Sequence, residues 1–221
     1  MNGQHPSERN STDPERIVRN GYDYHRTDHT VDATISFREV TMDRDLERLH
    51  EWCGYDHVKP FWQLDLPLPE FRERLAEKLA DDHLTPYIGY VDHVPMSYWE
   101  VYWAAEDDLA QYYDARSGDR GAHVLFGPEE FVGRGYAIPF VRALGLWQFS
   151  HPATDRAVLE PDARNEVIIH VLQQCGFELR EEFSFEEEEK TAALMLCSQE
   201  RFEATLLDDG EEVPRRGIAD D

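Results

Sequence analysis

The feature that most limits the fold of this chain is a regular alternation of strand-like and helix-like segments between residues 34 and 196. Short segments rich in β-branched and aromatic residues predict strands at 34–40, 87–91, 95–104, 120–126, 156–159, 177–185 and 191–196. Apolar residues at helical spacing predict helices at 42–53, 69–80, 135–149 and 165–175. This pattern, in which strand–helix–strand units are joined to hairpins, predicts an α/β fold (α+β mixed) with a mixed central sheet and helices on both faces.

The two ends of the chain lack this pattern. Residues 1–31 and 208–221 are polar and aperiodic, so we expect disordered tails on either side of one domain at 32–207. The chain has 46 acidic and 22 basic residues and a net charge of −24, which argues against nucleic acid and anionic membranes as partners. Lysine occurs only as Lys59, Lys78 and Lys190, and an acidic, lysine-poor composition is typical of halophilic proteins.

No sequence signal indicates export, a membrane span or a metal. The N-terminus lacks a basic segment followed by an apolar one, and no long apolar run occurs. The three cysteines, Cys53, Cys175 and Cys197, are widely spaced and match no zinc-binding pattern. We therefore expect a cytoplasmic protein without a metal, present as a monomer or a homodimer.

A glycine loop, Gly133-Arg134-Gly135, lies between the predicted strand at 120–126 and the helix that follows. Glycines let the backbone approach a ligand closely, and the free amides at a helix start favour phosphate. The motif alone is weak evidence, because the same pattern is more often just a tight turn. It is also too short for a Walker A loop and lacks that motif's lysine.

The motifs around this loop make it informative. The loop helix is followed by a strand ending in Glu160-Pro161-Asp162, by Asn165 at the next helix start, and by Gly176-Phe177 after that helix. This order resembles the GNAT superfamily of acetyltransferases, which implies acetyl-CoA as cosubstrate. The residues implied in binding it are Val132, Gly133, Arg134, Gly135 and Tyr136 at the pyrophosphate and Asn165 at the pantetheine arm. Glu130 departs from the Gln or Arg that usually opens the family's loop, so its side chain is expected to point away.

An aromatic and acidic run at 98–107 narrows the resemblance. It is followed by Arg120-Gly121-Ala122-His123, and a segment with His57 and Trp62 precedes it. Together these are similar to the siderophore-biosynthesis branch of GNAT, which includes the N6-hydroxylysine acetyltransferase of aerobactin synthesis and the mycobactin lysine acyltransferase. The resemblance implies a small-molecule acceptor, either an N-hydroxylated diamine or N6-hydroxylysine, and a hydroxamate product.

Three residues are candidate catalytic groups: His123, Glu160 and Asp162. An isolated strand histidine is more often structural, but the matching histidine of this branch binds substrate near the transferred acyl group. The match implies that His123 contacts the acceptor nitrogen or acts as base. Glu160 aligns with an acid of the mycobactin enzyme and is the preferred carboxylate base. Asp162 is the second choice, and its alternative role is to cap the helix that follows.

Further substrate-binding candidates come from the predicted hairpin strand and from the loop between the first two helices. Tyr98, Glu100 and Tyr102 lie on the strand at 95–104, where one face is expected to line the acceptor channel. A carboxylate such as Glu100 would suit a cationic amine. His57 and Trp62 lie in the loop, which covers the acceptor side in GNAT folds.

Two alternatives stay open at the level of sequence. An aminoglycoside 6'-N-acetyltransferase has similar motifs, and its polycationic acceptor suits an acidic cleft. A GNAT-like module that binds CoA without catalysis is favoured only by Glu130. Whether the acceptor is a hydroxylamine or a plain amine, the enzyme has to position two reactants and polarise the thioester carbonyl with a backbone N–H. A plain amine needs a base, whereas a hydroxylamine is less basic and already nucleophilic.

Overall fold

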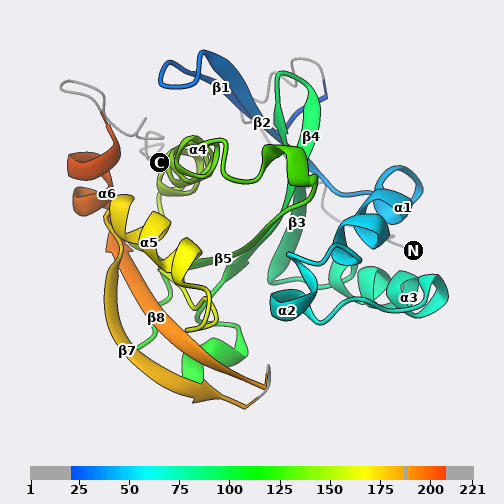
Figure 1. Ribbon diagram of the computed structural model, residues 1–221. Coiled ribbons are helices and arrows are strands. Elements are labelled where there is room, and N and C mark those ends of the chain that lie inside the picture. Colours follow the sequence, from blue (N-terminus) through cyan, green and yellow to red (C-terminus); the bar gives the residue numbers. More distant parts are fainter. Residues whose placement is uncertain (1–20, 187–188, 208–221) are drawn as a thin grey trace, which may run out of the picture.

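The computed structural model describes residues 21–186 and 189–207, which fold around one eight-stranded sheet (Figure 1). The strand order is β1-β2-β3-β4-β5-β6-β8-β7. The strands are β1 Tyr24–Asp28, β2 Ala33–Glu39, β3 Leu84–Val91, β4 Val94–Trp103, β5 Asp119–Phe126, β6 Arg156–Leu159, β7 Glu178–Phe185 and β8 Lys190–Ser198. The β5–β6 pair is parallel, and the other neighbouring strands pair antiparallel.

Helices cover both faces of this sheet, which confirms the predicted fold class. The helices of the described residues are α1 Met42–Cys53, α2 Lys59–Trp62, α3 Leu68–Leu79, α4 Ala137–Phe149, α5 Glu166–Gln174 and α6 Gln199–Leu206. In Figure 1, α1, α2 and α3 lie on one side of the sheet, and α4, α5 and α6 lie on the other. Short 3-10 turns occur at Asp108–Gln111 and Glu129–Phe131.

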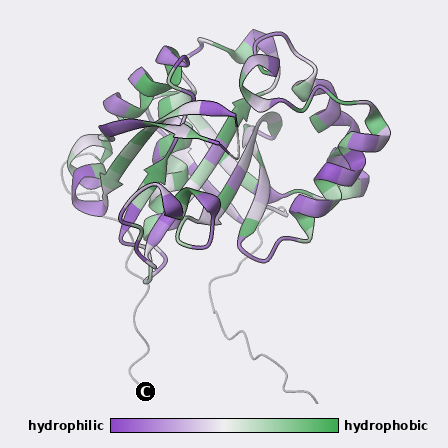
Figure 2. Ribbon diagram, turned by 90° about the horizontal axis from the view of Figure 1, so that it is seen from below, coloured by the Kyte–Doolittle hydropathy of each residue, from purple (hydrophilic) through white to green (hydrophobic). Residues whose placement is uncertain are grey.

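Alternation along the strands divides the apolar side chains between the two faces. On β4, Tyr98 packs in the cluster under α1 and α3, whereas its neighbour Trp99 packs in the cluster under α4, α5 and α6. In Figure 2, hydrophobic residues concentrate on the central strands and polar residues on the outer helices. Because both faces are covered, a ligand reaches the middle of the sheet most directly through a gap between strands.

Such a gap separates β5 from β6. The two strands pair only from Asp119 to Gly121 and from Arg156 to Val158, and then diverge. On its other edge, β5 stays paired with β4 as far as Phe126. The carboxyl-terminal half of β5 therefore has an edge that no strand covers. At this point the sheet is open from one face to the other.

One predicted boundary is wrong. The expected N-terminal tail at 1–31 includes strand β1, which pairs with β2. The sequence did not predict this strand because its residues are mostly polar, as is typical of an edge strand with one solvated face. Its apolar contact is made by Tyr24, which stacks on Trp147 of α4 with ring centroids 5.4 Å apart. The rest of that tail, 1–20, and the predicted tail at 208–221 lie outside the described residues.

The predicted helix at 165–175 forms as α5, but its expected buried face is partly wrong. Val167 is 76% exposed, whereas Leu172 and Cys175 are buried. The buried face of α5 is therefore narrower than the apolar residues of its sequence predict. Helices α2 and α6 were not predicted. They have four and eight residues, which is too short for hydrophobic periodicity to be recognised in the sequence.

Candidate active site

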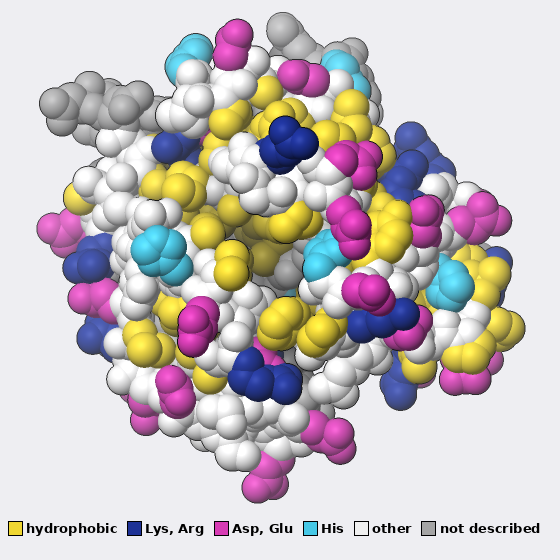
Figure 3. Space-filling model, in the orientation of Figure 1, with side chains coloured by type: hydrophobic (Ala, Val, Ile, Leu, Met, Phe, Trp, Pro, Cys, Tyr) yellow, Lys and Arg dark blue, Asp and Glu magenta, His cyan; other side chains and the backbone are white. Residues whose placement is uncertain are grey.

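A cavity of about 490 Å³ lies at the gap between β5 and β6. Its residues come from α2 and α3 on one face of the sheet, from β4, β5 and β6 in the middle, and from α4, α5 and α6 on the other face. Figure 3 shows the hollow in this face of the molecule, with hydrophobic side chains gathered around it. The cavity thus connects the two faces of the sheet, and its polar side chains gather at the centre.

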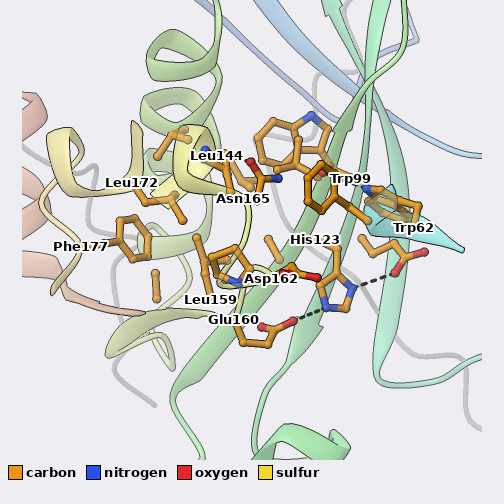
Figure 4. Close-up of a pocket in the computed structure, with 18 of the residues that line it drawn as sticks. Trp62, Trp99, His123, Leu144, Leu159, Glu160, Asp162, Asn165, Leu172 and Phe177 are labelled. Carbon is orange, nitrogen blue, oxygen red and sulfur yellow. Dashed lines mark hydrogen bonds and ion pairs between the residues drawn. The ribbon is translucent and has the colours of Figure 1, made fainter. Parts of the chain in front are cut away.

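His123 lies at that centre, between two carboxylates (Figure 4). Its Nδ1 is 3.0 Å from Glu100 Oε2, and its Nε2 is 2.6 Å from Glu160 Oε1. The two carboxylates are 1% exposed, and the imidazole is 23% exposed, on the cavity side. Since carboxylates accept hydrogen bonds, two such contacts require a proton on both ring nitrogens, so the imidazole is held as a cation.

Strand register explains why these three groups meet. Glu100 on β4 is the direct cross-strand partner of His123 on β5, so their side chains share one face. Glu160 follows the last residue of β6, just where that strand has begun to diverge from β5. A Cβ at Gly121 would lie 2.2 Å from the ring of Tyr102, so a glycine is needed for this ring to cross β5.

The Glu100 carboxylate is fully occupied by groups of the chain. The Lys78 ammonium lies 2.9 Å from Oε1 and 3.0 Å from Oε2, and the Tyr98 hydroxyl donates to Oε1 at 2.8 Å. With His123 on Oε2, both oxygens are engaged. Glu100 lines the cavity, and the prediction that it holds a cationic amine of the acceptor stays a prediction; in the structure Lys78 is the cation on its carboxylate.

Glu160 has a similar set of partners. The Tyr102 hydroxyl donates to Oε2 at 2.8 Å, and the Lys190 ammonium lies 3.7 Å from Oε1. Glu100 and Glu160 thus flank His123 with the same three kinds of neighbour: an imidazole, a lysine and a tyrosine. Together the two carboxylates face three cationic groups, so the cluster has one excess positive charge.

These contacts shift the pKa values in opposite directions. Burial lowers the pKa of His123, but the charge of Glu160 and the hydrogen bonds that the ring donates to both carboxylates outweigh it and raise that pKa to about 10. Burial raises the pKa of each carboxylate, yet contact with the imidazole and the lysines brings the pKa of Glu100 and of Glu160 down to about 2. At neutral pH the cluster is an imidazolium between two carboxylates.

Two predicted substrate-binding tyrosines are corrected. Tyr98 and Tyr102 are 3% and 0% exposed and do not line the cavity. Because they lie two residues before and two residues after Glu100 on β4, they share its face of the strand. Their hydroxyls donate to the two carboxylates. Their role is to hold the carboxylates in place.

The two candidates from the α1–α3 region lie at the uncovered edge of β5. Trp62 Nε1 donates to Val124 O at 3.3 Å and also lines the cavity. His57 Nε2 donates to Phe126 O at 2.8 Å but lies outside the cavity lining, so its predicted contact with substrate is corrected. Through these hydrogen bonds, the segment between α1 and α3 is attached to the edge of β5.

Asp162 and Asn165 both line the cavity. Asp162 is paired with Arg164 at 2.6 Å, which lowers the pKa of the carboxyl and makes it a poorer base. It does not cap α5, because Asn165 does so: its Oδ1 accepts from Ile168 N at 3.3 Å. In Figure 4, Asn165 lies on the far side of the cavity from Trp62.

The glycine loop has two residues in the left-handed region, Gly133 with φ 72° and Gly135 with φ 85°. A Cβ at either position would meet nothing within 4 Å, so open space lies beside the loop. Val132 N donates to Glu129 O and Arg134 N to Phe131 O, so these two predicted phosphate donors are occupied. In the described chain the amides of Gly133, Gly135 and Tyr136 have no such acceptor, and they precede α4 directly.

Replacing Gly135 with alanine is expected to raise the dissociation constant for CoA about 10-fold. A side chain at φ 85° costs on the order of 1–3 kcal/mol, and the loop relieves this strain by turning its amides away. Isothermal calorimetry with CoA measures the change. Gly21→Ala is the matched control, because Gly21 has φ 77° and equally open surroundings but lies before β1. Equal CoA affinity in wild type and Gly135→Ala would contradict a phosphate role for the loop.

The sequence-based reading missed Lys78 and Lys190. Both line the cavity and contact the buried carboxylates. The signal that would have found them is their rarity: the chain has three lysines, and two of them reach this one cluster. The compact charge of a lysine ammonium suits contact with a buried carboxylate.

Residues 41–185 match the family model of the acetyltransferase (GNAT) domain. The chain is 34% identical over 170 residues to an N-hydroxyputrescine acetyltransferase from Acinetobacter baumannii, covering 77% of this chain and 80% of that protein. It is 33% identical over 174 residues to an N(6)-hydroxylysine O-acetyltransferase from Escherichia coli, covering 78% of this chain and 55% of the relative. The chain thus spans about half the length of this second relative.

Solved structures agree with this assignment. An uncharacterized protein from Bacillus halodurans superposes with a TM-score of 0.80 at 42% identity, covering 83% of this chain and 93% of the other. Aminoglycoside acetyltransferase AAC(6')-Ib in complex with coenzyme A superposes with a TM-score of 0.70 at 25% identity, covering 77% and 98%. Within 21–186 and 189–207, no helix is long and apolar enough to cross a bilayer, and no cluster of His, Cys, Asp and Glu side chains is suited to a metal ion.

Proposed function

We propose that this chain, which belongs to the GNAT acetyltransferase family, transfers the acetyl group of acetyl-CoA to an N-hydroxylated amine, giving a hydroxamate for siderophore biosynthesis. The observation that carries the proposal is the position of His123, held as a cation between two buried carboxylates at the gap between β5 and β6. A cationic acid at neutral pH suits an acceptor that needs no strong base. Both relatives named above act, by their names, on hydroxylated amines.

The donor side of the site is built from backbone groups. The amides of Gly133, Gly135 and Tyr136 fit a pyrophosphate at the start of α4. Trp62, on α2, donates its indole N–H to the carbonyl of Val124, so this carbonyl points to the edge of β5 away from β4. In an antiparallel pair a residue directs its N–H and its C=O to the same side. We therefore assign the Val124 N–H to the thioester carbonyl, where it would stabilise the charge that develops on oxygen.

The proton balance of the transfer assigns His123 its role. A bound CoA thioester supplies the acyl group and leaves as a thiol. The acceptor nitrogen loses one proton and the departing sulfur gains one. Both N–H groups of His123 are donated to Glu100 and Glu160, so the ring would exchange one of these contacts for the sulfur, donate that proton to it, and recover a proton from the nitrogen; no net proton is consumed. Glu160 and Glu100 would hold the ring in place and keep it charged, rather than act as bases themselves.

The charges of the cavity disfavour the aminoglycoside alternative. A polycationic acceptor needs unpaired carboxylates, but Glu100 and Glu160 are paired with Lys78, Lys190 and His123. Asp162, which also lines the cavity, is paired with Arg164. The acidic surface of the chain as a whole does not extend into this site.

Thiol release from acetyl-CoA tests the proposal. The protein is incubated at high salt, which screens its net charge, with N6-hydroxylysine, an N-hydroxylated diamine, lysine or kanamycin. We expect turnover with at least one hydroxylamine and at least ten-fold lower kcat/KM with lysine, because the protonated imidazole cannot deprotonate an ordinary amine.

Two results would count against the proposal. Turnover with kanamycin alone would favour the aminoglycoside activity. CoA binding by calorimetry, without thiol release for any acceptor, would favour a module that binds CoA and does not catalyse transfer.

A further inference from the structure

The acceptor end of the cavity is basic, although the chain as a whole is strongly acidic. Arg74 and Lys78 both line the cavity from α3, four residues apart on the same side of the helix. The central cluster already has one more cation than anion, with His123 protonated. In a chain with a net charge of −24, this excess of positive charge at one place points to an anionic ligand group.

Arg74 has free hydrogen-bonding capacity in this region. Its Nη1 donates to Glu77 Oε2 at 3.1 Å, a surface pair one turn away on the same helix. Within the described chain its other guanidinium N–H groups have no hydrogen-bond acceptor. Because a guanidinium has five donors in a planar fork, the free edge of Arg74 can bind a carboxylate with two parallel hydrogen bonds.

Lys78 can contribute a third donor. An ammonium group has three N–H bonds, and two of them are used by the oxygens of Glu100. The side chain is 33% exposed and lines the cavity, so its remaining N–H is reachable from inside. Lys78 therefore lies between the buried cluster and the mouth of the site.

We propose that the acceptor carries a carboxylate at the end opposite its reacting nitrogen, and that Arg74 and Lys78 bind this carboxylate. The substrate class is then an N-hydroxylated amino acid rather than an N-hydroxylated diamine. This inference rests on the proposed function, because it takes the nitrogen to react beside His123. Arg74 and Lys78 determine specificity and take no part in the transfer itself.

The spacing of the basic groups fits such a molecule. Lys78 Nζ and His123 Nδ1 each lie 3.0 Å from the same atom, Glu100 Oε2, so they are separated by at most about twice that distance. Arg74 precedes Lys78 by one helical turn, which places its Cα about 6 Å away along α3. An aliphatic amino acid of the length of lysine, with its hydroxylated nitrogen at His123, extends far enough for its carboxylate to lie between these two side chains.

A diamine has no group that this end of the cavity would recognise. Its free end is an ammonium, which would approach Lys78 and Arg74 with like charge. Juxtaposed like charges oppose binding even where solvent screens them in part. The same repulsion would act against each amino group of an aminoglycoside.

Two acceptors that differ only in the carboxylate test the inference. N6-hydroxylysine and N-hydroxycadaverine have the same nucleophile and the same carbon chain, but the second lacks the carboxylate. With wild-type protein and saturating acetyl-CoA, we expect kcat/KM for N6-hydroxylysine to be roughly 10- to 100-fold higher, as a charge-assisted pair predicts. The difference should appear mainly in KM, because the groups involved do not touch the reacting atoms.

Variants on α3 then separate recognition from a structural effect. Arg74→Gln is expected to raise KM for N6-hydroxylysine about 10-fold and to lower KM for N-hydroxycadaverine, because the variant loses the carboxylate contact and also removes a like charge. Arg74→Lys keeps the charge without the fork and should restore part of the loss. Arg72→Gln is the matched control, because Arg72 lies on the same helix, is exposed and does not line the cavity.

The outcomes distinguish this inference from the proposed function. Equal kcat/KM for the two acceptors, or an equal loss for both in Arg74→Gln, would overturn the carboxylate site while hydroxylamine acetylation still stands. Release of thiol with neither hydroxylamine would overturn the proposed function, and the carboxylate site with it.

Discussion

Replacing His123 with alanine is expected to lower kcat by about 10²- to 10⁴-fold, the range that a positioned proton donor contributes. CoA affinity should stay near the wild-type value, because the pyrophosphate loop at 133–136 begins beyond the end of β5 and the imidazole contacts side chains of β4 and of the β6 end. The measurements are thiol release under saturating acceptor and calorimetric titration with CoA. The effect is large because removal of the ring also takes away the only group that links Glu100 to Glu160 among the described contacts.

Two further variants make this experiment decisive. His170→Ala is the matched control, since His170 is an exposed residue of α5. Alanine at 123 also leaves two buried carboxylates without the imidazolium, which can cost about 3–5 kcal/mol of stability. His123→Gln therefore serves as a second variant that fills the space and keeps one donor. A collapse of CoA binding in a folded His123→Gln protein would place His123 on the cofactor side and contradict the proposed role.

Replacing Glu160 with glutamine is expected to shift the alkaline limb of the pH profile of kcat/KM to lower pH. The charge of Glu160 is the largest influence that raises the pKa of His123, which reaches about 10 in the native site. Activity that needs the protonated ring persists in the wild type until the pH nears that value. In the variant the ring deprotonates earlier, so at pH 9 we expect at least about 10-fold lower kcat/KM, with a smaller loss at pH 7.

Tyr102→Phe is the control for this variant. It removes the hydrogen bond to Glu160 Oε2 and keeps the carboxylate charge, so the alkaline limb should move much less. An alkaline limb that stays in place in Glu160→Gln would show that a group other than His123 sets it. A limb that moved equally far in Tyr102→Phe would assign the effect to ring geometry instead of charge.

The same pKa shifts define where the cluster stabilises the fold. The pKa of His123 is raised above its ordinary 6.5, so its contribution is complete below pH 6.5 and is lost as the pH rises towards 10. The pKa values of Glu100 and Glu160 are lowered from 4.5, so their contribution is complete above pH 4.5 and is lost as the pH falls towards 2. The stability that Glu160→Gln removes should therefore be largest between these limits, at pH 4.5–6.5.

Much of the fold follows from local pattern. Strands such as β5 and β6 and helices such as α4 were predicted within two or three residues, because periodicity and β-branched composition are properties of short segments. Edge strand β1 and the short helices α2 and α6 were not predicted. Their formation depends on the sheet against which they pack, as the stacking of Tyr24 on Trp147 illustrates.

The candidate site divides in a similar way. Motif order alone was enough to bring forward His123, Glu160 and Asn165, all of which line one cavity. It did not separate residues that line the cavity from residues one layer behind, so Tyr98 and Tyr102 were assigned to substrate although both are buried. Spacing along a strand specifies which residues share a face, but not what covers that face.

The family, the element order and the central histidine could therefore be predicted from the sequence, since each rests on local patterns and on the order of motifs along the chain. The charge state of that histidine was not. It depends on Glu100, Glu160, Lys78 and Lys190, which come from β4, the end of β6, α3 and β8 and meet at the gap between β5 and β6. Electrostatic energy depends on distance in space and on burial, and the fold sets both.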